Sequence, residues 1–591
     1  MPSLRRLVPA VAALVALTLA IPLLCDAAPG PAAPPQSTTA ASPAGQVPLS
    51  REWKRLPSDE FTIVGTSSAK DLAQLAVELE TFLAVLQQMT PSLRLASPVP
   101  TYVVALKDFG AFTSYQPRGP DGRRMDWVAG YFSPGFDGNY LVAPWSGKDS
   151  DSLAVMLHEL THHLANRNVG VVPTWVSEGV AEFYSTFRID AGRNVAVVGE
   201  PPRNRVRSLI GKALIPMDRF FAVASTNEFT SSPVELDLFY AQSWALVHYF
   251  FVGDQGARTR QIGTYLRALE RGQAPSSAFT LAFGTTYDEL GKQLVKYVRE
   301  LQFPVFRLKP SGPGGLTPDP SRVSPMPEAD AAALQAVLFA RMGAVDDAEA
   351  ALGRAMAQPP PSLQTRIALD RVRRQLGQQA DEAAQYEQLA ALASQAAATK
   401  PLEASTQFYL SMAALAAGKE AESDAALEAA VRLNPDADML RQRAYAAFAL
   451  GNDAVAARDA RSYLQGQVRD WETASYVTFL GALALRRLKQ DDEAARLLTK
   501  AGSVVAADTW TARVLDYMQG KTAAAAFLAS ATNDGERTEA HTYVGFDDAL
   551  AGRREAAVAH FRWVKDKGSR NFVEYPLAVA ELNRLEASGS K

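Results

Sequence analysis

The sequence predicts an α+β domain followed by an all-α solenoid of helical repeats, and three observations lead to this expectation. Strand-like and helix-like patterns are mixed over about residues 51–307, whereas alanine-rich helical patterns fill about 328–588. A Pro- and Gly-rich stretch, residues 308–327, separates the two and reads as a linker. A chain of 591 residues is long enough to bury several cores.

The overall composition is that of a folded globular protein. Hydrophobic residues make up 47% of the chain and charged residues 21%, and 60 basic residues face 63 acidic ones. This balance gives no basic footprint for nucleic acid, so no nucleic-acid partner is expected. The single cysteine, Cys25, lies in the N-terminal segment, so cysteine-protease and disulfide chemistry are excluded for a processed chain.

The N-terminus has the pattern of an export signal. Arg5 and Arg6 precede an apolar run, and small residues follow it, which predicts a signal peptide over 1–27 with cleavage after Ala27. A lipoprotein anchor at Cys25 is disfavoured because Leu24 stands before it. Residues 28–50 are rich in Pro, Ala and Ser and predict a disordered linker. We therefore expect an exported protein, periplasmic or secreted, with no transmembrane segment in the mature chain.

Local patterns predict the elements of the first domain. Strands are expected at FTIVG from Phe61 and TYVVAL from Thr101, with a helix over 69–89 between them. The runs WVAGYF from Trp127 and NYLVA from Asn139 predict a hairpin. Further helices are expected over 152–166, 174–187 and 236–252.

The second region repeats itself every 31 to 41 residues. A turn glycine recurs five positions before an alanine-type residue, with Lys489 standing in for one of these glycines. Segments such as residues 413–435 resemble the tetratricopeptide repeat, with an irregular α-solenoid as the alternative. The resemblance implies a surface that binds a protein partner.

One short motif carries the chemistry. His158 and His162 are four residues apart on a predicted helix, so their imidazoles lie on one face and can converge on one metal ion. Glu159, one position after His158, is out of the ligand register and can act as a general base. The motif predicts one catalytic Zn²⁺ per chain, with a third protein ligand supplied from elsewhere.

The segment PTWVSEGVAEFY from Pro173 extends this motif. With fifteen residues between His162 and Glu178, the chain resembles the gluzincin metallopeptidases of the thermolysin and aminopeptidase N clan. The resemblance implies a zincin-like fold for 51–307, Glu178 as the third zinc ligand, and Glu182 as an outer residue that orients a ligand. It also implies that Tyr240 donates a hydrogen bond to the oxyanion, although Gln242 and Ser243 depart from the family pattern at this helix.

The substrate side of the site is predicted less directly. The chain lacks the G-x-M-E-N string with which aminopeptidase N relatives hold a free amine, which favours an endopeptidase. The strand containing Ala129, Gly130 and Tyr131 lies at a suitable distance before His158 to pair with a peptide by β-augmentation. His163 lies off the ligand face and His248 reads as a core residue, so neither is expected to bind the metal.

These inferences combine into one functional expectation. The chain is predicted to be an exported zinc-dependent metallopeptidase that hydrolyses peptide bonds with zinc-activated water, and whose repeats recruit a protein substrate or partner. The alternative is a non-catalytic cell-envelope scaffold whose zinc site is structural or vestigial. Structural zinc sites are usually closed by four Cys or His ligands, and no cysteine remains after processing, which favours an open catalytic site.

Overall fold

The structure, a computed structural model, describes residues 53–588 with short gaps, and divides them into two compact units. The predicted signal peptide 1–27 and linker 28–50 lie outside the described residues. The first unit holds most of the chain up to Met326, and the second holds Pro327 onward together with 117–124 and 135–138. Within 53–588 the residues not described are 98, 120–121, 136–137, 148–149, 169–171, 191–194, 224, 230–231, 311–316, 358–361, 377–381, 399–401, 467–470, 503–504, 506–508 and 571.

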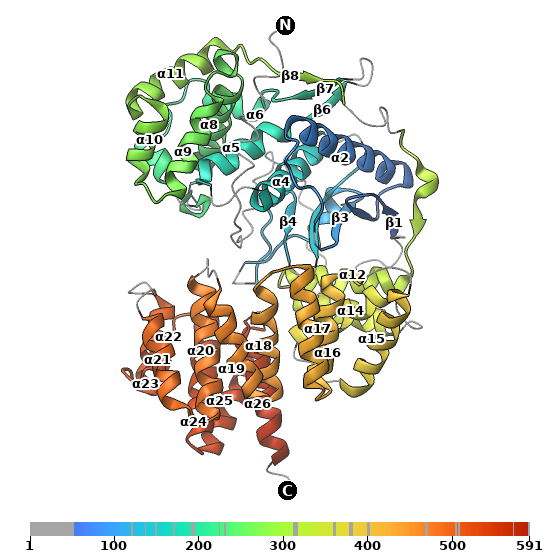
Figure 1. Cartoon of the computed structure of the whole chain (residues 1–591), viewed down its shortest axis with the longest axis vertical. Coiled ribbons are helices and arrows are strands. Elements are labelled where there is room, and N and C mark those ends of the chain that lie inside the picture. Colours follow the sequence, from blue (N-terminus) through green and yellow to red (C-terminus); the bar gives the residue numbers. More distant parts are fainter. Residues whose placement is uncertain are drawn as a thin grey trace, which may run out of the picture. The chain divides into compact units, whose positions relative to one another are not determined.

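A six-stranded sheet organises the first unit (Figure 1). Its order is β4-β5-β3-β2-β1-β9, with β2, β3 and β5 parallel and the outer strands antiparallel. The sequence predicted an α+β domain with mixed strands and helices. The structure shows an α/β arrangement in its centre, because long crossovers join the parallel strands β2, β3 and β5. The strands are β1 (Lys54–Pro57), β2 (Thr62–Gly65), β3 (Thr101–Leu106), β4 (Tyr131–Ser133), β5 (Asn139–Pro144) and β9 (Ser324–Pro325).

Two long helices pack on this sheet. Helix α2 (Ala69–Met89) forms the crossover between β2 and β3, and the side chain of Ser68 caps its N-terminus by accepting from the amide of Asp71. Helix α4 (Ser150–Asn168) follows β5 and contacts both β4 and β5. Both helices occupy ranges that the 3.6-residue hydrophobic period predicts, and both bury leucines in the same core.

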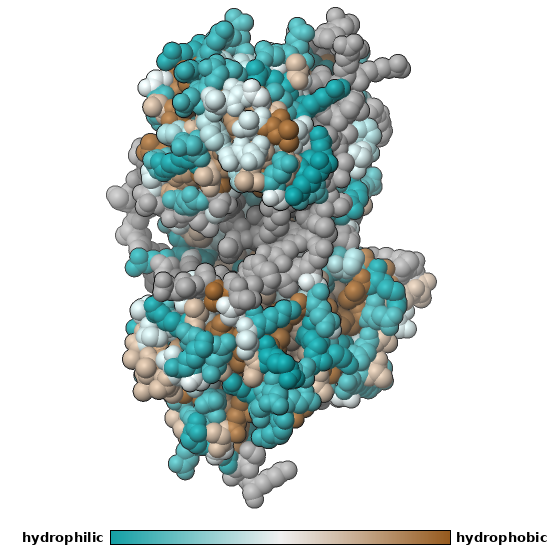
Figure 2. Space-filling view, turned by 60° about the vertical axis from the view of Figure 1, so that its left-hand side comes forward, coloured by the Kyte–Doolittle hydropathy of each residue, from teal (hydrophilic) through white to brown (hydrophobic). Residues whose placement is uncertain are grey.

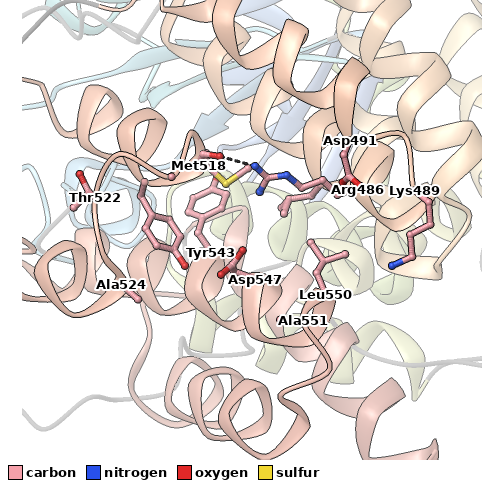
Figure 3. Close-up of a pocket in the computed structure, with 13 residues that line it drawn as sticks. Arg486, Lys489, Asp491, Met518, Thr522, Ala524, Tyr543, Asp547, Leu550 and Ala551 are labelled. Carbon is pink, nitrogen blue, oxygen red and sulfur yellow. Dashed lines mark hydrogen bonds between the residues drawn. The ribbon is translucent and has the colours of Figure 1, made fainter.

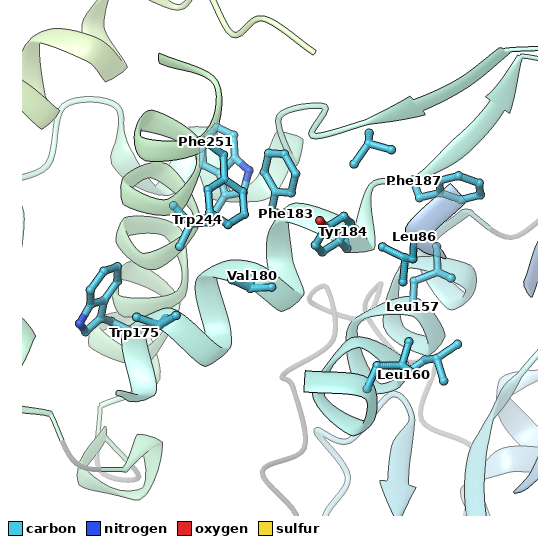
Figure 4. Packing of buried hydrophobic residues seen from close by; sticks show 14 of the residues in the cluster. Leu86, Leu157, Leu160, Trp175, Val180, Phe183, Tyr184, Phe187, Trp244 and Phe251 are labelled. Carbon is cyan, nitrogen blue, oxygen red and sulfur yellow. The ribbon is translucent and has the colours of Figure 1, made fainter. Parts of the chain in front are cut away.

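A layer of helices completes the unit. Helix α5 (Thr174–Ser185) packs closely against α8 (Pro233–Phe251), and Figure 4 shows Phe183 of α5 beside Phe251 of α8. A Cβ atom at Gly179 would lie 2.4 Å from the carbonyl oxygen of Ser243, so the two backbones approach closely only because α5 has glycine there. The remaining helices are α3 (Phe109–Thr113), α6 (Arg203–Leu209), α7 (Met217–Ala222), η2 (Thr226–Phe229), η3 (Gly253–Gly256), α9 (Thr259–Glu270), α10 (Pro275–Phe283), α11 (Tyr287–Glu300) and η4 (Pro320–Arg322).

The end of the first unit differs from the sequence expectation. A small antiparallel sheet joins β6 (Arg188–Asp190), β7 (Val195–Val198) and β8 (Phe306–Leu308), which local patterns did not predict. The later strand β9 pairs with β1, and Arg322 donates to the carbonyl of Pro57. Part of the predicted linker 308–327 therefore belongs to the first unit, because its backbone groups complete a sheet edge.

From Pro327 onward, the regular elements of the second unit that the structure describes are helices. Neighbouring helices pair along the chain, as in a solenoid (Figure 1). Turn glycines such as Gly418 and Gly451 have positive φ, and Lys489 adopts the same left-handed conformation with φ 61° in place of a glycine. The helices are α12 (Glu328–Arg341), α13 (Val345–Met356), α14 (Leu363–Gln375), α15 (Glu382–Ala397), α16 (Ala404–Ala416), α17 (Glu420–Leu433), α18 (Asp438–Leu450), α19 (Asp453–Gln465), α20 (Trp471–Arg487), α21 (Asp491–Ala501), α22 (Trp510–Met518), α23 (Ala524–Ala529), α24 (Asp534–Leu550), α25 (Arg554–Lys567) and α26 (Glu574–Ser588).

The last helix folds back onto earlier repeats. Helix α26 packs against α18 as well as α24 and α25. Its Glu581 accepts from Arg487, and its Arg584 donates to the carbonyl of Ala449. Helix α26 thereby covers parts of α18, α20 and α24.

The molecular surface carries both polar and apolar side chains. Figure 2 shows a face on which hydrophilic residues predominate and hydrophobic ones form small patches. Among the residues that the structure describes, no helix combines the length and the apolar character needed to cross a membrane.

Candidate metal centre

Helix α4 places the histidine motif inside the first unit. Its apolar residues Leu157 and Leu160 are fully buried in the hydrophobic core, which fixes the rotation of the helix (Figure 4). That rotation leaves His158 and Glu159 buried, with 3% and 4% of their surfaces exposed. The side chain of His162, one turn later, is 12% exposed and forms the more open side of the group.

Three ligand-type atoms converge between α4 and α5. The Nε2 atoms of His158 and His162 lie 3.0 Å apart. Oε2 of Glu178 lies 3.3 Å from the first nitrogen and 3.4 Å from the second. These three residues form a group that could hold a metal ion. It is the one such cluster of His, Cys, Asp or Glu side chains found among the residues that the structure describes. The structure thus brings together the three ligands that the sequence predicted.

The chemistry of the three atoms suits a cation. Oε2 of Glu178 is buried and makes no hydrogen bond of normal geometry. Burial raises the pKa of the Glu178 carboxyl, but the imidazoles of His162 and His158 outweigh burial and lower this pKa to about 2. Two imidazole nitrogens and an ionised carboxylate oxygen, all directed at one point, therefore present the donor set that a divalent metal requires.

Each histidine has a polar neighbour at its other ring nitrogen, Nδ1. Oγ of Ser177 lies 3.0 Å from Nδ1 of His162, within hydrogen-bond distance. Oε1 of Glu182 lies 3.6 Å from Nδ1 of His158, a close polar contact. Partners at Nδ1 orient the ring and leave Nε2 for a metal. Glu182 lies on the outer side of His158, as the sequence predicted, whereas Ser177 was not predicted.

A buried arginine stands behind Glu182. Arg205 of α6 is 4% exposed and donates to both carboxylate oxygens of Glu182, from Nη2 at 2.7 Å and from Nε at 3.1 Å. Its Nη1 donates to Asp237 at 2.6 Å, and Ser208 donates to the other oxygen of Asp237. Burial lowers the pKa of the Arg205 guanidinium, but Glu182 and Asp237 outweigh burial and raise it above its ordinary value.

Helix α8 brings Tyr240 to the same place. The ring of Tyr240 is 1% exposed, and its centre lies 6.3 Å from that of the His158 ring in an edge-to-face arrangement. Gln242, which replaces the lysine of the aminopeptidase N pattern that the sequence resembles, accepts from the amide of Ile215 at 2.9 Å and donates to its carbonyl at 3.0 Å. This departure from the pattern has a structural role, since Gln242 fastens the preceding loop to α8.

The predicted substrate strand is only partly a strand. Tyr131 begins β4, which lies at the edge of the six-stranded sheet, while Ala129 and Gly130 precede the strand in a bend. A Cβ atom at Gly130 would meet the side chain of Val155 at 2.7 Å, so this bend lies against α4 three residues before His158.

The two other histidines of the region have structural contacts. His163 stacks on Phe132 with 4.4 Å between ring centres, and burial followed by the charge of Arg167 lowers its pKa to about 3. His248 contacts the hydroxyl of Tyr297 at 2.8 Å and the carbonyl of Gly199 at 3.0 Å. Both histidines therefore lie in packed surroundings outside the metal group.

Comparison with known protein families finds a match to a family that has no assigned activity. Residues 152–267 match a family described as a protein of unknown function (DUF1570). This range contains the whole group from His158 to Tyr240, including Arg205 and Asp237, but covers a minority of the chain. No curated protein matches the sequence.

Proposed function

We propose that this chain is a zinc-dependent metallopeptidase of the gluzincin type that cleaves within polypeptides. The observation that carries the proposal is the buried triangle of His158, His162 and Glu178, with the buried carboxylate of Glu159 next in sequence to the first ligand. Zinc in such an N, N, O donor set acts as a Lewis acid and lowers the pKa of water toward neutrality.

The residues of the chain then have distinct tasks. Glu159 takes a proton from the attacking water and returns it to the leaving amine, as a general base and then a general acid. Tyr240 donates a hydrogen bond to the carbonyl oxygen as negative charge develops on it. The edge strand β4, which begins at Tyr131, pairs with the substrate backbone and holds the scissile bond over α4.

The second unit is proposed to bind a protein substrate or partner. It has a recess of about 480 Å³ where the C-terminal ends of α20, α22 and α24 meet (Figure 3). Arg486 donates to the carbonyl of Met518 at one wall, and Asp547 and Leu550 contribute polar and apolar surface to the lining. A recess of this size accepts one or two side chains of another protein.

We also propose that the protein is exported to the periplasm or the medium. This part of the proposal rests on the N-terminal sequence alone.

The proposed function is tested by metal analysis and cleavage profiling of the purified full chain. We expect about one zinc ion per chain and internal cleavage of a peptide library that a zinc chelator abolishes and added zinc restores. A protein containing the preferred site should have a higher kcat/KM than a short peptide of the same sequence if the helical unit contributes binding. Tightly bound zinc with no cleavage of any peptide or protein would favour the scaffold alternative.

A separate prediction concerns the hydroxyl of Tyr240. Tyr240→Phe should lower kcat by about 10²- to 10³-fold with little change in KM, because the hydroxyl acts on the transition state. Tyr249→Phe, on the same helix, is the matched control and should retain activity. Steady-state kinetics on one peptide checks both variants. A change in KM alone for Tyr240→Phe would place this residue in substrate binding.

A further inference from the structure

Arg205 connects the candidate metal centre to the protein behind it. Its guanidinium bonds both oxygens of Glu182 on one side and Asp237 on the other. The same group lies over the ring of Tyr240, with Cζ 5.0 Å from the ring centre. One buried side chain therefore contacts two residues that themselves adjoin His158.

Simple packing does not account for this arrangement. Removing a guanidinium and a carboxylate from water is costly, and an apolar pair of similar volume is often no less stable. The bidentate contact instead gives orientation, since both oxygens of Glu182 are fixed in one plane by the planar donor. Fixing that carboxylate fixes the position of its Oε1 atom, which lies 3.6 Å from Nδ1 of His158.

Asp237 supports Arg205 from the far side. It accepts from Nη1 of Arg205 and from Ser208, so the guanidinium is held between two carboxylates. The side chain of Asp237 is 36% exposed, whereas those of Arg205 and Glu182 are almost fully buried. These ionic contacts thus run from the partly exposed Asp237, near the start of α8, through Arg205 and Glu182 to His158 on α4.

We propose that Arg205 is a positioning residue of the metal centre. It acts on His158 through Glu182, and it holds the ring of Tyr240 through a cation–π contact. The inference rests on the metal-binding part of the proposed function and extends it to a residue that touches neither metal nor substrate. Loss of an outer partner of this kind typically weakens metal binding about 10- to 100-fold.

The first test measures zinc affinity of the full chain by competition with a chromophoric chelator. Arg205→Met should weaken zinc binding about 10- to 100-fold, and Arg205→Lys should weaken it less, because lysine keeps the charge but not the planar fork. Arg207→Met is the matched control, since Arg207 is exposed on the same helix and should leave the affinity unchanged. Thermal unfolding of the zinc-free variants shows whether each one is folded.

A double-mutant cycle separates positioning from general destabilisation. If Arg205 acts through Glu182, Arg205→Met should add little to the loss of zinc affinity already caused by Glu182→Gln. The visible spectrum of the cobalt-substituted protein should change with Arg205→Met and not with Arg207→Met. Unchanged zinc affinity in Arg205→Met, or losses that multiply in the double variant, would overturn the inference.

Two further results keep the test decisive. If Arg205→Met does not fold, Asp237→Asn replaces it: a loss of about 3- to 10-fold supports the inference, and unchanged affinity overturns it. Zinc affinity needs no substrate, so a wild-type chain that binds zinc but cleaves nothing contradicts the proposed peptidase function alone. Affinity that does not respond to these variants contradicts only the role of Arg205.

Discussion

Replacing Glu178 with alanine should abolish stoichiometric zinc binding and, with it, all zinc-dependent cleavage. Oε2 of Glu178 lies 3.3 and 3.4 Å from the two imidazole nitrogens, and this carboxylate is the anionic member of the group. Without it, two imidazole nitrogens remain, which is one ligand fewer than catalytic zinc sites use. The zinc content after dialysis against a metal-buffered solution measures the effect.

Thermal unfolding gives an independent readout of the same change. A ligand that binds only the native state at 100 times its Kd stabilises the protein by about 2.7 kcal/mol. Added zinc should therefore raise the unfolding temperature of the wild-type chain and leave that of Glu178→Ala unchanged. The zinc-free variant needs to be compared with the zinc-free wild type, because removing a buried carboxylate also changes intrinsic stability.

The matched control for Glu178 lies one turn further on the same helix. Glu182→Ala should weaken zinc binding by about 10- to 100-fold without abolishing it, because Glu182 faces Nδ1 of His158 rather than the metal-facing Nε2. If Glu182→Ala lost more zinc than Glu178→Ala, the roles of the two glutamates would have to be exchanged.

The convergence of the three ligands was predictable because it depends on short-range geometry. The i, i+4 spacing of His158 and His162 fixes their relative positions once a helix forms, and the hydrophobic period of residues 152–166 predicts that helix. The place of Glu178 came from resemblance to a known motif rather than from local physics. The structure brings it to the two histidines, and its role as a zinc ligand stays a prediction.

The residues behind the ligands could not be predicted from local patterns. The segment RNRVR contains three arginines, and nothing in their spacing shows that Arg205 is the buried one. The choice depends on how α6 packs against α8, which is a tertiary property. One signal was available: a buried Glu182 requires a partner, and an arginine within the next 30 residues was a candidate.

The arrangement of strands in the two sheets also could not be predicted from local sequence patterns. The strands β2, β3 and β5 carry clear β-branched runs, and only their parallel arrangement was missed. Strand β8 pairs with β7 although more than 100 residues separate them, and β9 pairs with β1 from a segment whose prolines predict a linker. Such short edge strands are defined by their partners, so their own sequence gives little indication of them.

The repeat period of the helical unit was easier to predict than the packing of its last helix, α26, onto α18. Turn glycines mark the repeats, and Lys489 takes a left-handed backbone at one of these positions because the turn geometry is required by its neighbours. The return of α26 onto α18 depends on ion pairs such as Arg487 with Glu581, 94 residues apart in sequence. A contact of this range leaves no periodic signal.

The second large effect is expected for Glu159→Gln. This change keeps the shape of the side chain and removes its ability to accept a proton, so zinc binding should stay near the wild-type level while kcat falls. General acid–base catalysis contributes about 10²- to 10⁴-fold, and a loss of at least this size is expected because Glu159 serves in both proton transfers. Zinc content and kcat are measured on the same preparation.

The position of Glu159 makes this variant selective for chemistry over metal binding. Glu159 is 4% exposed on α4 and does not belong to the convergent ligand group. Glu178→Ala therefore provides the contrast, since it should lose both zinc and activity, whereas Glu159→Gln should lose activity alone. Turnover by Glu159→Gln comparable to that of the wild type would exclude Glu159 as the base and return the assignment to another group near the triangle.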